Sequence, residues 1–358
     1  MNLDAHRRQD SAEWLRVARQ RPAFGSGRPH MRHALRVESL PIEELGPEWV
    51  AMLNRERSGV DRWCSSMLWS HSVQRAFGSD STLLCGVGES GSCVAFARYP
   101  LDNSDHALVP LDLVWSFGSA VLGIAGRAGA DEVADFLTRD GARAVFFGGL
   151  CEGSGPWRSL VDVFGDRQRL LLGEERVRCR AALDGGVDGY LSRRSREFRR
   201  NLRQTDRRVC GAGVQVEVLD DVDPGTVMAR LTIVERSSWK GHDGSGIVSP
   251  KMATLYDLVA RELSRTGGLR VSVAVDGDGH DLGFILGGIQ GDTYRGLQLS
   301  FVEDARSLGL GNYLQWHEIQ RLCTDENDVC TYDLGMDMAY KRTWSEALHT
   351  TRTLVAVR

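Results

Sequence analysis

The stretch that decides the fold is GLRVSVAVDGDGHDLGFILGGIQGDTYRGLQLSFVEDARSLGLG, residues 268–311. It holds three apolar or alternating segments, at 268–275, 282–290 and 293–302, with Gly- and Asp-containing turns between them. Short segments divided by such turns predict three antiparallel strands. After the Gly-rich end of the stretch, apolar side chains recur at helical spacing over residues 312–323, which predicts a helix.

The same kind of pattern continues outward from this stretch. Residues 329–334 are predicted to form a strand, residues 338–347 can be helical, and residues 351–357 alternate as a last strand. The first half of the chain repeats this order more faintly. Its strands are predicted at 82–87, 93–99, 108–115, 142–147 and 177–183, and its helices at 131–139 and 156–164. Two similar α/β units indicate an internal duplication of element order.

The length of 358 residues corresponds to about two domains of ordinary size. A Gly-rich, acidic stretch at 184–189 is the expected boundary, which gives an N-terminal unit at 35–187 and a C-terminal unit at 188–358. Residues 1–34 carry seven arginines against three acidic side chains and include a turn-rich segment. We expect this tail to be disordered.

The composition is that of an ordinary globular chain, with 42% hydrophobic and 26% charged residues and a net charge of −4. It excludes a wholly disordered or collagen-like protein, and the total charge does not indicate nucleic acid or membrane as the partner. The eight cysteines form no Cys-x-x-Cys pair, so we expect reduced thiols and no metal site. With no apolar segment of signal-peptide or membrane-spanning length, the sequence predicts a soluble, cytoplasmic protein without membrane insertion.

Two Gly-rich segments have the spacing of phosphate-binding loops. The segment GVGESG, residues 86–91, matches a dinucleotide fingerprint by letter, but a strand follows it and not a helix, so we interpret it as a hairpin turn. The segment RSLGLG, residues 306–311, follows a predicted strand and opens a predicted helix. There the unpaired amides of a helix N-terminus would converge on an anion, and glycine would let a ligand approach the backbone.

A basic helix is predicted at residues 192–209. It carries eight arginines, with Phe198, Leu202 and Val209 forming an apolar stripe. Two interpretations stay open: a docked helix whose outer faces are solvated arginines, or a seat for the phosphates of a cofactor or an RNA.

Four motifs together resemble one branch of a known superfamily. These are the Arg-x-x-Gly-x-Gly loop at 306–311, SREFRRNLRQTDRR at 195–208, ERSSWKGHDGSG at 235–246 and YKRTW at 340–344. The chain is similar to the CelD-like branch of the GNAT acyltransferases, which is associated with cellulose and polysaccharide biosynthesis and is related in fold to the double-GNAT Fem peptidyltransferases. The resemblance implies an α/β (α+β) fold of two tandem GNAT-like units, each a mixed, mainly antiparallel sheet flanked by helices.

The resemblance also implies an activity, that of an N-acyltransferase. The donor would be acetyl-CoA or another acyl-CoA, and the acceptor an amine of a small molecule, a sugar or a natural-product intermediate. The residues expected to bind the cofactor are Arg306, Ser307, Leu308, Gly309, Leu310, Gly311, Leu299 and Phe301. Two alternatives remain: a Fem-like transferase that uses aminoacyl-tRNA, with tRNA on the basic helix, or a non-catalytic pathway partner. The sequence leaves the oligomeric state undetermined.

Acyl transfer from a thioester needs a donor to the oxyanion, a base for the amine and an acid for the thiolate. A backbone amide between Leu299 and Phe301 is the candidate oxyanion donor. Asp333 and Asp337 are candidate bases because they follow the next predicted strand, although each is also a candidate helix cap. Tyr340 is the candidate acid, with a core aromatic as the alternative.

Four further residues are candidates for substrate binding: Trp239, Lys240, His242 and Lys341. The Trp239 segment is a polar loop that suits either a substrate lid or an ordinary packed turn. His242 is a possible base or a solvated side chain. The chain has only three lysines, at 240, 251 and 341, so each marks either a point charge with a role or a chance occurrence. Lys341 would hold an anion if it points into the cleft.

Overall fold

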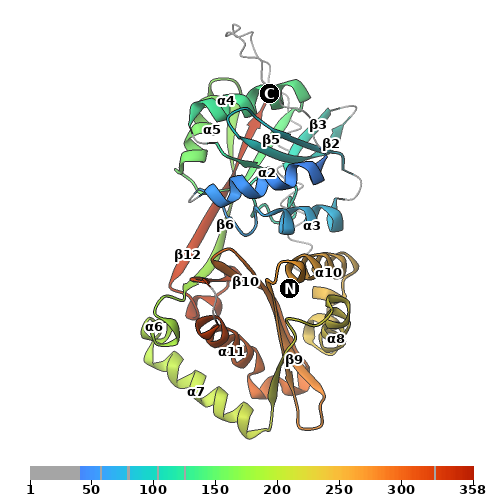
Figure 1. Ribbon diagram of the computed structural model, residues 1–358, viewed down its shortest axis with the longest axis vertical. Coiled ribbons are helices and arrows are strands. Elements are labelled where there is room, and N and C mark those ends of the chain that lie inside the picture. The colour runs from blue at the N-terminus through green and yellow to red at the C-terminus, as the bar shows by residue number, and fades with distance from the viewer. Residues whose placement is uncertain (1–40, 57–58, 79–80, 103–104, 125, 326–327) are drawn as a thin grey trace. The chain divides into compact units, whose positions relative to one another are not determined.

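The computed structural model describes residues 41–358 except 57–58, 79–80, 103–104, 125 and 326–327. The predicted tail at 1–34 lies outside the described residues. The chain divides into two compact units (Figure 1). Unit 1 comprises the chain up to Arg176 together with Thr350–Arg358, and unit 2 comprises Val177–His349.

Unit 1 is built on strands in the order β1-β2-β3-β5-β12. The strands are β1 (Leu83–Val87), β2 (Cys93–Asp102), β3 (Asp105–Pro110), β4 (Val121–Leu122), β5 (Ala144–Leu150), most of β6 (Arg169–Ala182) and the end of β12 (Ala347–Val357). The helices are α2 (Ile42–Arg55), α3 (Met67–Phe77), α4 (Arg127–Asp140) and α5 (Gly155–Gly165). Residues 86–91 form the turn of the β1–β2 hairpin, as expected, with Val87 opposite Cys93.

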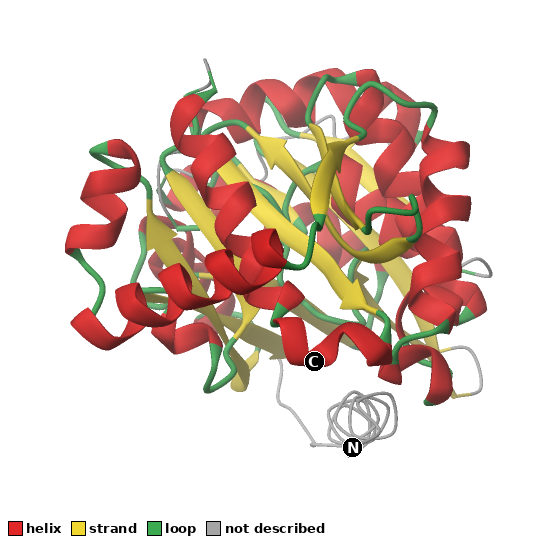
Figure 2. Ribbon diagram, turned by 90° about the horizontal axis from the view of Figure 1, so that it is seen from below, coloured by secondary structure: helices red, strands yellow, loops and turns green. Residues whose placement is uncertain are grey.

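Unit 2 is built on strands in the order β6-β11-β10-β9-β8-β7, in which β6 contributes its last residues. The strands are β7 (Gln215–Val218), β8 (Leu269–Val275), β9 (Asp281–Gln290), β10 (Thr293–Phe301) and β11 (Thr331–Met336). The helices are α6 (Gly186–Ser192), α7 (Arg196–Gly211), α8 (Pro224–Arg236), α9 (Trp239–His242), α10 (Pro250–Arg265), α11 (Leu310–Thr324) and the 3₁₀ turns η1 (Gly246–Val248), η2 (Glu303–Leu308) and η3 (Lys341–Thr343). Figure 2 shows helices lying along the strands.

The expected repetition of element order is present. In unit 1, β1, β2 and β3 pair antiparallel, and β5 lies parallel to β3. In unit 2, β8, β9 and β10 pair antiparallel, and β11 lies parallel to β10. In each unit a helix, α4 or α11, connects the two parallel strands. The fold class is therefore the predicted one: two tandem GNAT-like units with mixed, mainly antiparallel sheets. None of the described helices combines the length and the apolar character that crossing a bilayer requires.

The sheet of unit 2 has two different faces. Tyr294 and Tyr332 pack with Trp316 and Ile319 of α11, so they lie on the α11 face. Arg295 follows Tyr294 and pairs with Gly288, where the side chain of Leu263 from α10 lies close. Because side chains alternate along a strand, Arg295 and Asp333 lie on the opposite face, which α8 and α10 cover (Figure 1). We call this the α8–α10 face.

Strands β10 and β11 pair over only part of their length. The parallel register runs from Thr293 opposite Thr331 to Arg295 opposite Asp333 and stops there. On its other side β10 remains paired with β9 as far as Phe301, with a bulge between Gly296 and Gln298. A bulge bends its strand and increases the twist. Beyond Arg295, the edge of β10 that faces away from β9 is therefore open.

The last predicted strand of each unit lies in the other unit. The strand predicted at 177–183 forms the end of β6 and pairs with β11 in unit 2. The C-terminal strand, β12, pairs through Arg352 to Val357 with β5 in unit 1. The compact units accordingly change at Val177 and Thr350, whereas we expected a single boundary at residue 187.

The prediction of a helix at residues 338–347 is wrong. Only the 3₁₀ turn η3 forms there, because the following residues are held by contacts that a continued helix would break. Trp344 is buried against Phe198 at a ring distance of 4.9 Å, and its carbonyl accepts a hydrogen bond from Tyr190. Residues 111–115, predicted as strand, form a turn instead. Helices α8 and α10 were not predicted.

Gly287 of β9 should tolerate no side chain. A Cβ there would lie 2.1 Å from the hydroxyl oxygen of Tyr294. The ring of Tyr294 is fully buried and lies tilted against that of Tyr332, with the ring centres 4.7 Å apart. We expect Gly287→Ala to lower the free energy of unfolding by about 1–3 kcal/mol. Gly277→Ala is the matched control, because a Cβ at Gly277 meets no atom within 4 Å. Urea unfolding of both variants would contradict this packing if they were equally stable.

Candidate functional site

The predicted phosphate loop ends at the N-terminus of α11. Gly309 is the N-cap residue and has a φ of 78°, in the left-handed region that glycine adopts without strain. The amides of Asn312 and Tyr313 donate to the Gly309 carbonyl over 3.1 and 3.2 Å. No side chain caps this end. The first-turn amides of Leu310 and Gly311 are therefore the ones left for a ligand at the positive end of the helix.

Some of the other loop residues are buried and anchor the loop, and others are exposed to solvent. Leu310 is fully buried, and Leu308 packs partly buried against the same apolar cluster. Arg306 is exposed and ion-paired with Glu303 at 2.7 Å. The Ser307 carbonyl accepts a hydrogen bond from Arg208 of α7 at 2.8 Å. The loop is thus fixed in place while its backbone remains accessible at the helix end.

Gly311 lies against β10. A Cβ at Gly311 would meet the ring of Phe301 at 3.3 Å and the side chain of Leu299 at 3.4 Å. The structure therefore brings the three predicted residues together on the α11 face. Their close approach places the end of α11 beside the open edge of β10.

Helix α7 borders the loop. Its apolar stripe is confirmed in place, with Leu202 and Val209 buried and Phe198 against Trp344. Thr205 lies 3.4 Å from the position that a Cβ of Gly309 would occupy. Most of its arginines are exposed, namely Arg196, Arg200, Arg203, Arg207 and Arg208. The helix is docked by its apolar stripe with exposed arginines on its outer side, as the first interpretation states. A seat for phosphates stays a prediction.

Side chains from the α8–α10 segment bind the open edge of β10. The Leu299 carbonyl accepts from Lys240 Nζ at 2.7 Å, and the Leu297 carbonyl accepts from the Tyr256 hydroxyl at 3.2 Å. These carbonyls point away from β9. Because the N–H and the C=O of one strand residue point to the same side, the Leu299 amide also faces the open edge. This is the position predicted for the oxyanion donor.

Glu235, at the end of α8, is a candidate that the sequence reasoning missed. Its carboxylate is fully buried, and Oε1 accepts from the Ile247 amide at 3.0 Å and from Gln298 Nε2 in the β10 bulge. Among the described residues, Oε2 has no hydrogen-bond partner. A buried carboxylate oxygen beside an open strand edge is suited to accept a proton. The signal was present, since Glu235 opens the ERSSWKGHDGSG stretch.

Asp333 is surrounded by arginines on the α8–α10 face. It is fully buried, and its Oδ2 lies 2.9 Å from Arg178, 3.4 Å from Arg180 and 3.4 Å from Arg295. Burial alone would raise the pKa of this carboxyl, but the three guanidiniums hold it well below its usual range. A carboxylate stabilised in this way is a poor proton acceptor. Its contacts indicate that Asp333 instead holds the three arginines in position.

Asp337 is bound by its own neighbour. Arg342 contacts both carboxylate oxygens, with one hydrogen bond of 2.7 Å, and thereby lowers the pKa of Asp337 to about 2. It caps no helix, because the helix expected after it does not form. The structure therefore offers little support for Asp337 as the base.

Tyr340 and Lys341 lie at the turn η3. Tyr340 is 56% exposed, and desolvation of its hydroxyl raises its pKa. Lys341 is partly buried, and its Nζ lies 3.4 Å from the position that a Cβ of Gly335 would take. Burial and the Arg295 charge lower the pKa of Lys341 to about 8. Lys341 therefore points toward β11 and Asp333, and its predicted role in holding an anion stays a prediction.

The Trp239 segment is a short helix, α9, and not the predicted loop. Ser238 caps it by accepting from the amides of Lys240 and Gly241. Trp239 is 44% exposed, and Lys240 Nζ lies 5.9 Å from its ring centre. His242 ends the helix and is exposed, so the structure brings Lys240 to the β10 edge but leaves His242 at the surface.

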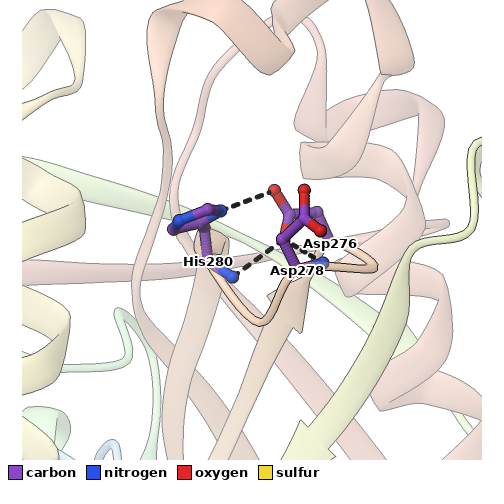
Figure 3. A group of neighbouring side chains, drawn as sticks. All are labelled: Asp276, Asp278 and His280. Atoms are coloured by element: carbon purple, nitrogen blue, oxygen red, sulfur yellow. Dashed lines mark hydrogen bonds and ion pairs between the residues drawn. The ribbon is translucent and has the colours of Figure 1, made fainter.

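One group of metal-ligand type occurs among the described residues, in the turn between β8 and β9 (Figure 3). Asp276 Oδ1 accepts from the amides of Asp278 and His280 at 3.0 and 2.8 Å, and the His280 ring lies 3.2 Å from Oδ2. These bonds lower the pKa of Asp276. These hydrogen bonds close an exposed turn, and this structural role is sufficient to explain why the three side chains lie together.

Replacing Lys341 by methionine should raise the free energy of unfolding at neutral pH by about 1–3 kcal/mol, because methionine fills similar space without a charge. The folded-state pKa of about 8 lies below the usual 10.5. Between these values the unfolded chain binds more protons than the folded one, so the parent protein gains stability as the pH rises. Urea unfolding should show the advantage of Lys341→Met shrinking across this window. A pH-independent difference would rule out a desolvated ammonium at this position.

Comparisons with known proteins concern the domain and the fold. The acetyltransferase (GNAT) domain family matches residues 196–342, which lie within unit 2. No curated protein sequence matches the chain. Two solved structures resemble it with a TM-score of 0.60 each. One is a conserved protein of unknown function from Bacteroides thetaiotaomicron, with 10% identity over 91% of this chain and 100% of that one. The other is FemX, with 13% identity over 86% and 95%.

A third similar structure is the C-terminal domain of a putative lysylphosphatidylglycerol synthetase from Agrobacterium fabrum. It has a TM-score of 0.53 and 15% identity, over 87% of this chain and 92% of that one. At such identities the likeness concerns the fold, whereas the family match concerns the residues that form the site. The chain thus carries a GNAT acetyltransferase domain at residues 196–342 and is an acyltransferase.

Proposed function

We propose that the protein is an acyl-CoA-dependent N-acyltransferase of the CelD-like branch, acting in the cytoplasm on an amine of a small molecule, a sugar or a natural-product intermediate. The observation that carries the proposal is the open edge of β10 beyond Arg295, with the N-terminus of α11 on one face of the sheet and ionisable side chains on the other. We infer that the donor binds on the α11 face and that the acceptor reaches the edge from the α8–α10 side.

The residues at the α11 N-terminus fit the pyrophosphate of an acyl-CoA. Gly309 takes a left-handed conformation and offers no side chain as a cap, and the amides of Leu310 and Gly311 are left for an anion. Phe301 and Leu299 would flank the chain that leads from the pyrophosphate to the thioester. The bound donor supplies an activated acyl group.

Three groups of the chain would then act on the reaction. The amine nitrogen attacks the thioester carbon, and the Leu299 amide donates to the carbonyl oxygen as it becomes negative. Glu235 Oε2 accepts the proton that the amine loses, directly or through a water. The carbon–sulfur bond breaks, and the Tyr340 hydroxyl protonates the departing thiolate. The products are an amide and a free thiol.

This proposal replaces Asp333 by Glu235 as the base. Asp333 binds three guanidiniums and is held ionised, whereas Glu235 has an oxygen without a partner among the described residues. The exposed arginines of α7 keep an aminoacyl-tRNA donor as the alternative, because a row of arginines next to the loop suits a polyanion. The two donors differ in whether acetyl-CoA binds at all.

Gly309→Val should weaken acetyl-CoA binding while the fold persists. A β-branched side chain at the N-cap would cover the amides of the first turn, so we expect the dissociation constant in isothermal calorimetry to rise at least about tenfold. Gly213→Val is the control, because Gly213 has a similar φ of 74° and open space around it. Equal binding by both variants, or no binding of any acyl-CoA by the parent, would overturn the donor assignment.

Tyr340→Phe and Glu235→Gln should each lower kcat by roughly 10²–10⁴-fold, because each removes one proton transfer. Glu262→Gln, on the exposed side of α10, is the matched control and should retain full activity. Full turnover by Glu235→Gln under conditions in which chemistry limits the rate would remove Glu235 from the mechanism.

A further inference from the structure

Two of the three lysines of this chain lie near strands β10 and β11 of unit 2. The chain uses arginine for nearly all its cations, yet lysine stands at 240 and 341. Lys240 Nζ binds the Leu299 carbonyl at the open edge of β10. Lys341 has Arg295, Asp333 and Lys240 among its electrostatic neighbours. The two ammonium groups are therefore near enough to repel each other, although they come from segments about 100 residues apart, one at the edge of β10 and the other beside Gly335 of β11.

Neither ammonium group has a carboxylate partner among the residues that the structure describes. The recorded contacts of Lys240 Nζ are the Leu299 carbonyl and the Trp239 ring, and that of Lys341 Nζ is the Tyr340 ring at 5.9 Å. Glu235 attracts Lys240 only at longer range. Both side chains are partly buried, so water does not fully compensate for the missing partners.

The surroundings add positive potential. Arg295 and Arg180 are cross-strand neighbours of Asp333, and Arg178 lies two residues before Arg180 on the same face of β6. All three contact the one carboxylate of Asp333. Lys341 thus stands next to a carboxylate that three guanidiniums already engage. The cations around Asp333 repel one another, and an anion bound beside them would offset that repulsion.

We propose that the α8–α10 face binds the acceptor through an anionic group, a carboxylate or a phosphate, held between Lys240 and Lys341. The ammonium groups would act as two point charges converging on one anion, with Tyr340 and the β10 edge beside them. The acceptor is then an amine that also carries a negative charge, oriented with its nitrogen toward the thioester. This inference rests on the proposed function for the identity of the ligand as acceptor, but the anion site itself requires no donor.

Thermal unfolding with inorganic phosphate and, separately, with acetate tests the site in the full chain. Both salts are titrated at constant ionic strength against sodium chloride. The parent protein should be stabilised saturably by at least one of them, and the preferred salt distinguishes a phosphate from a carboxylate. Lys341→Met should weaken the apparent affinity by about tenfold or more. Lys251→Met, which changes the third lysine on α10, should bind like the parent.

Lys240→Gln provides a second test of the anion site. The substitution removes the charge, but the glutamine side chain can still donate a hydrogen bond to the Leu299 carbonyl. It should fold and should lose affinity for the same salt as Lys341→Met does. No saturable stabilisation of the parent, or equal stabilisation of all four proteins, would overturn the anion site. Lysine-dependent anion binding in a protein that binds no acyl-CoA would leave the site standing and remove the donor assignment alone.

Discussion

The end of strand pairing between β10 and β11 is the constraint on which the rest of the site depends. Three residue pairs hold the strands together, and the last of them joins Arg295 to Asp333. Beyond that pair the bulge in β10 turns the strand away, and its backbone groups lose a strand partner. Buried backbone groups must be satisfied in some way. Here the side chains of Lys240 and Tyr256 satisfy two carbonyls. In the proposed reaction the Leu299 amide on the same side would donate to the reacting carbonyl oxygen.

The two faces of the sheet of unit 2 carry different kinds of chemical groups. On the α11 face, glycine at 309 and 311 brings a helix N-terminus against Leu299 and Phe301, which gives a site with backbone donors and few charges. On the α8–α10 face, Glu235, Asp333, Lys240 and Lys341 supply ionisable groups. Burial and the Arg295 charge lower the pKa of Lys341, so its charged form is disfavoured in the folded state. Such a cost is expected where a site is prepared for a ligand.

The sequence was sufficient wherever the signal was local. The hairpins of the 268–311 stretch, the Gly-rich turn before α11 and the apolar stripe of α7 each follow from residues adjacent in the chain. The prediction failed where distant residues decide. Arg178 and Arg180 lie about 150 residues before Asp333, so its role as an ion-pair partner could not be seen beforehand. The packing of Trp344 on Phe198 excludes the helix predicted at 338–347. Glu235 became a candidate only because the fold brings it to Gln298 in the β10 bulge.

Hydrogen exchange of the amides on addition of acetyl-CoA tests the central claim most directly. The account predicts slower exchange in peptides that contain the Leu299 amide and the amides of Leu310 and Gly311, together with the bordering segment of α7. The Gly-rich turn at 86–91 in unit 1 should exchange as before, because it closes a hairpin and opens no helix. Protection confined to that turn, or no protection at the N-terminus of α11 at saturating acetyl-CoA, would contradict the account.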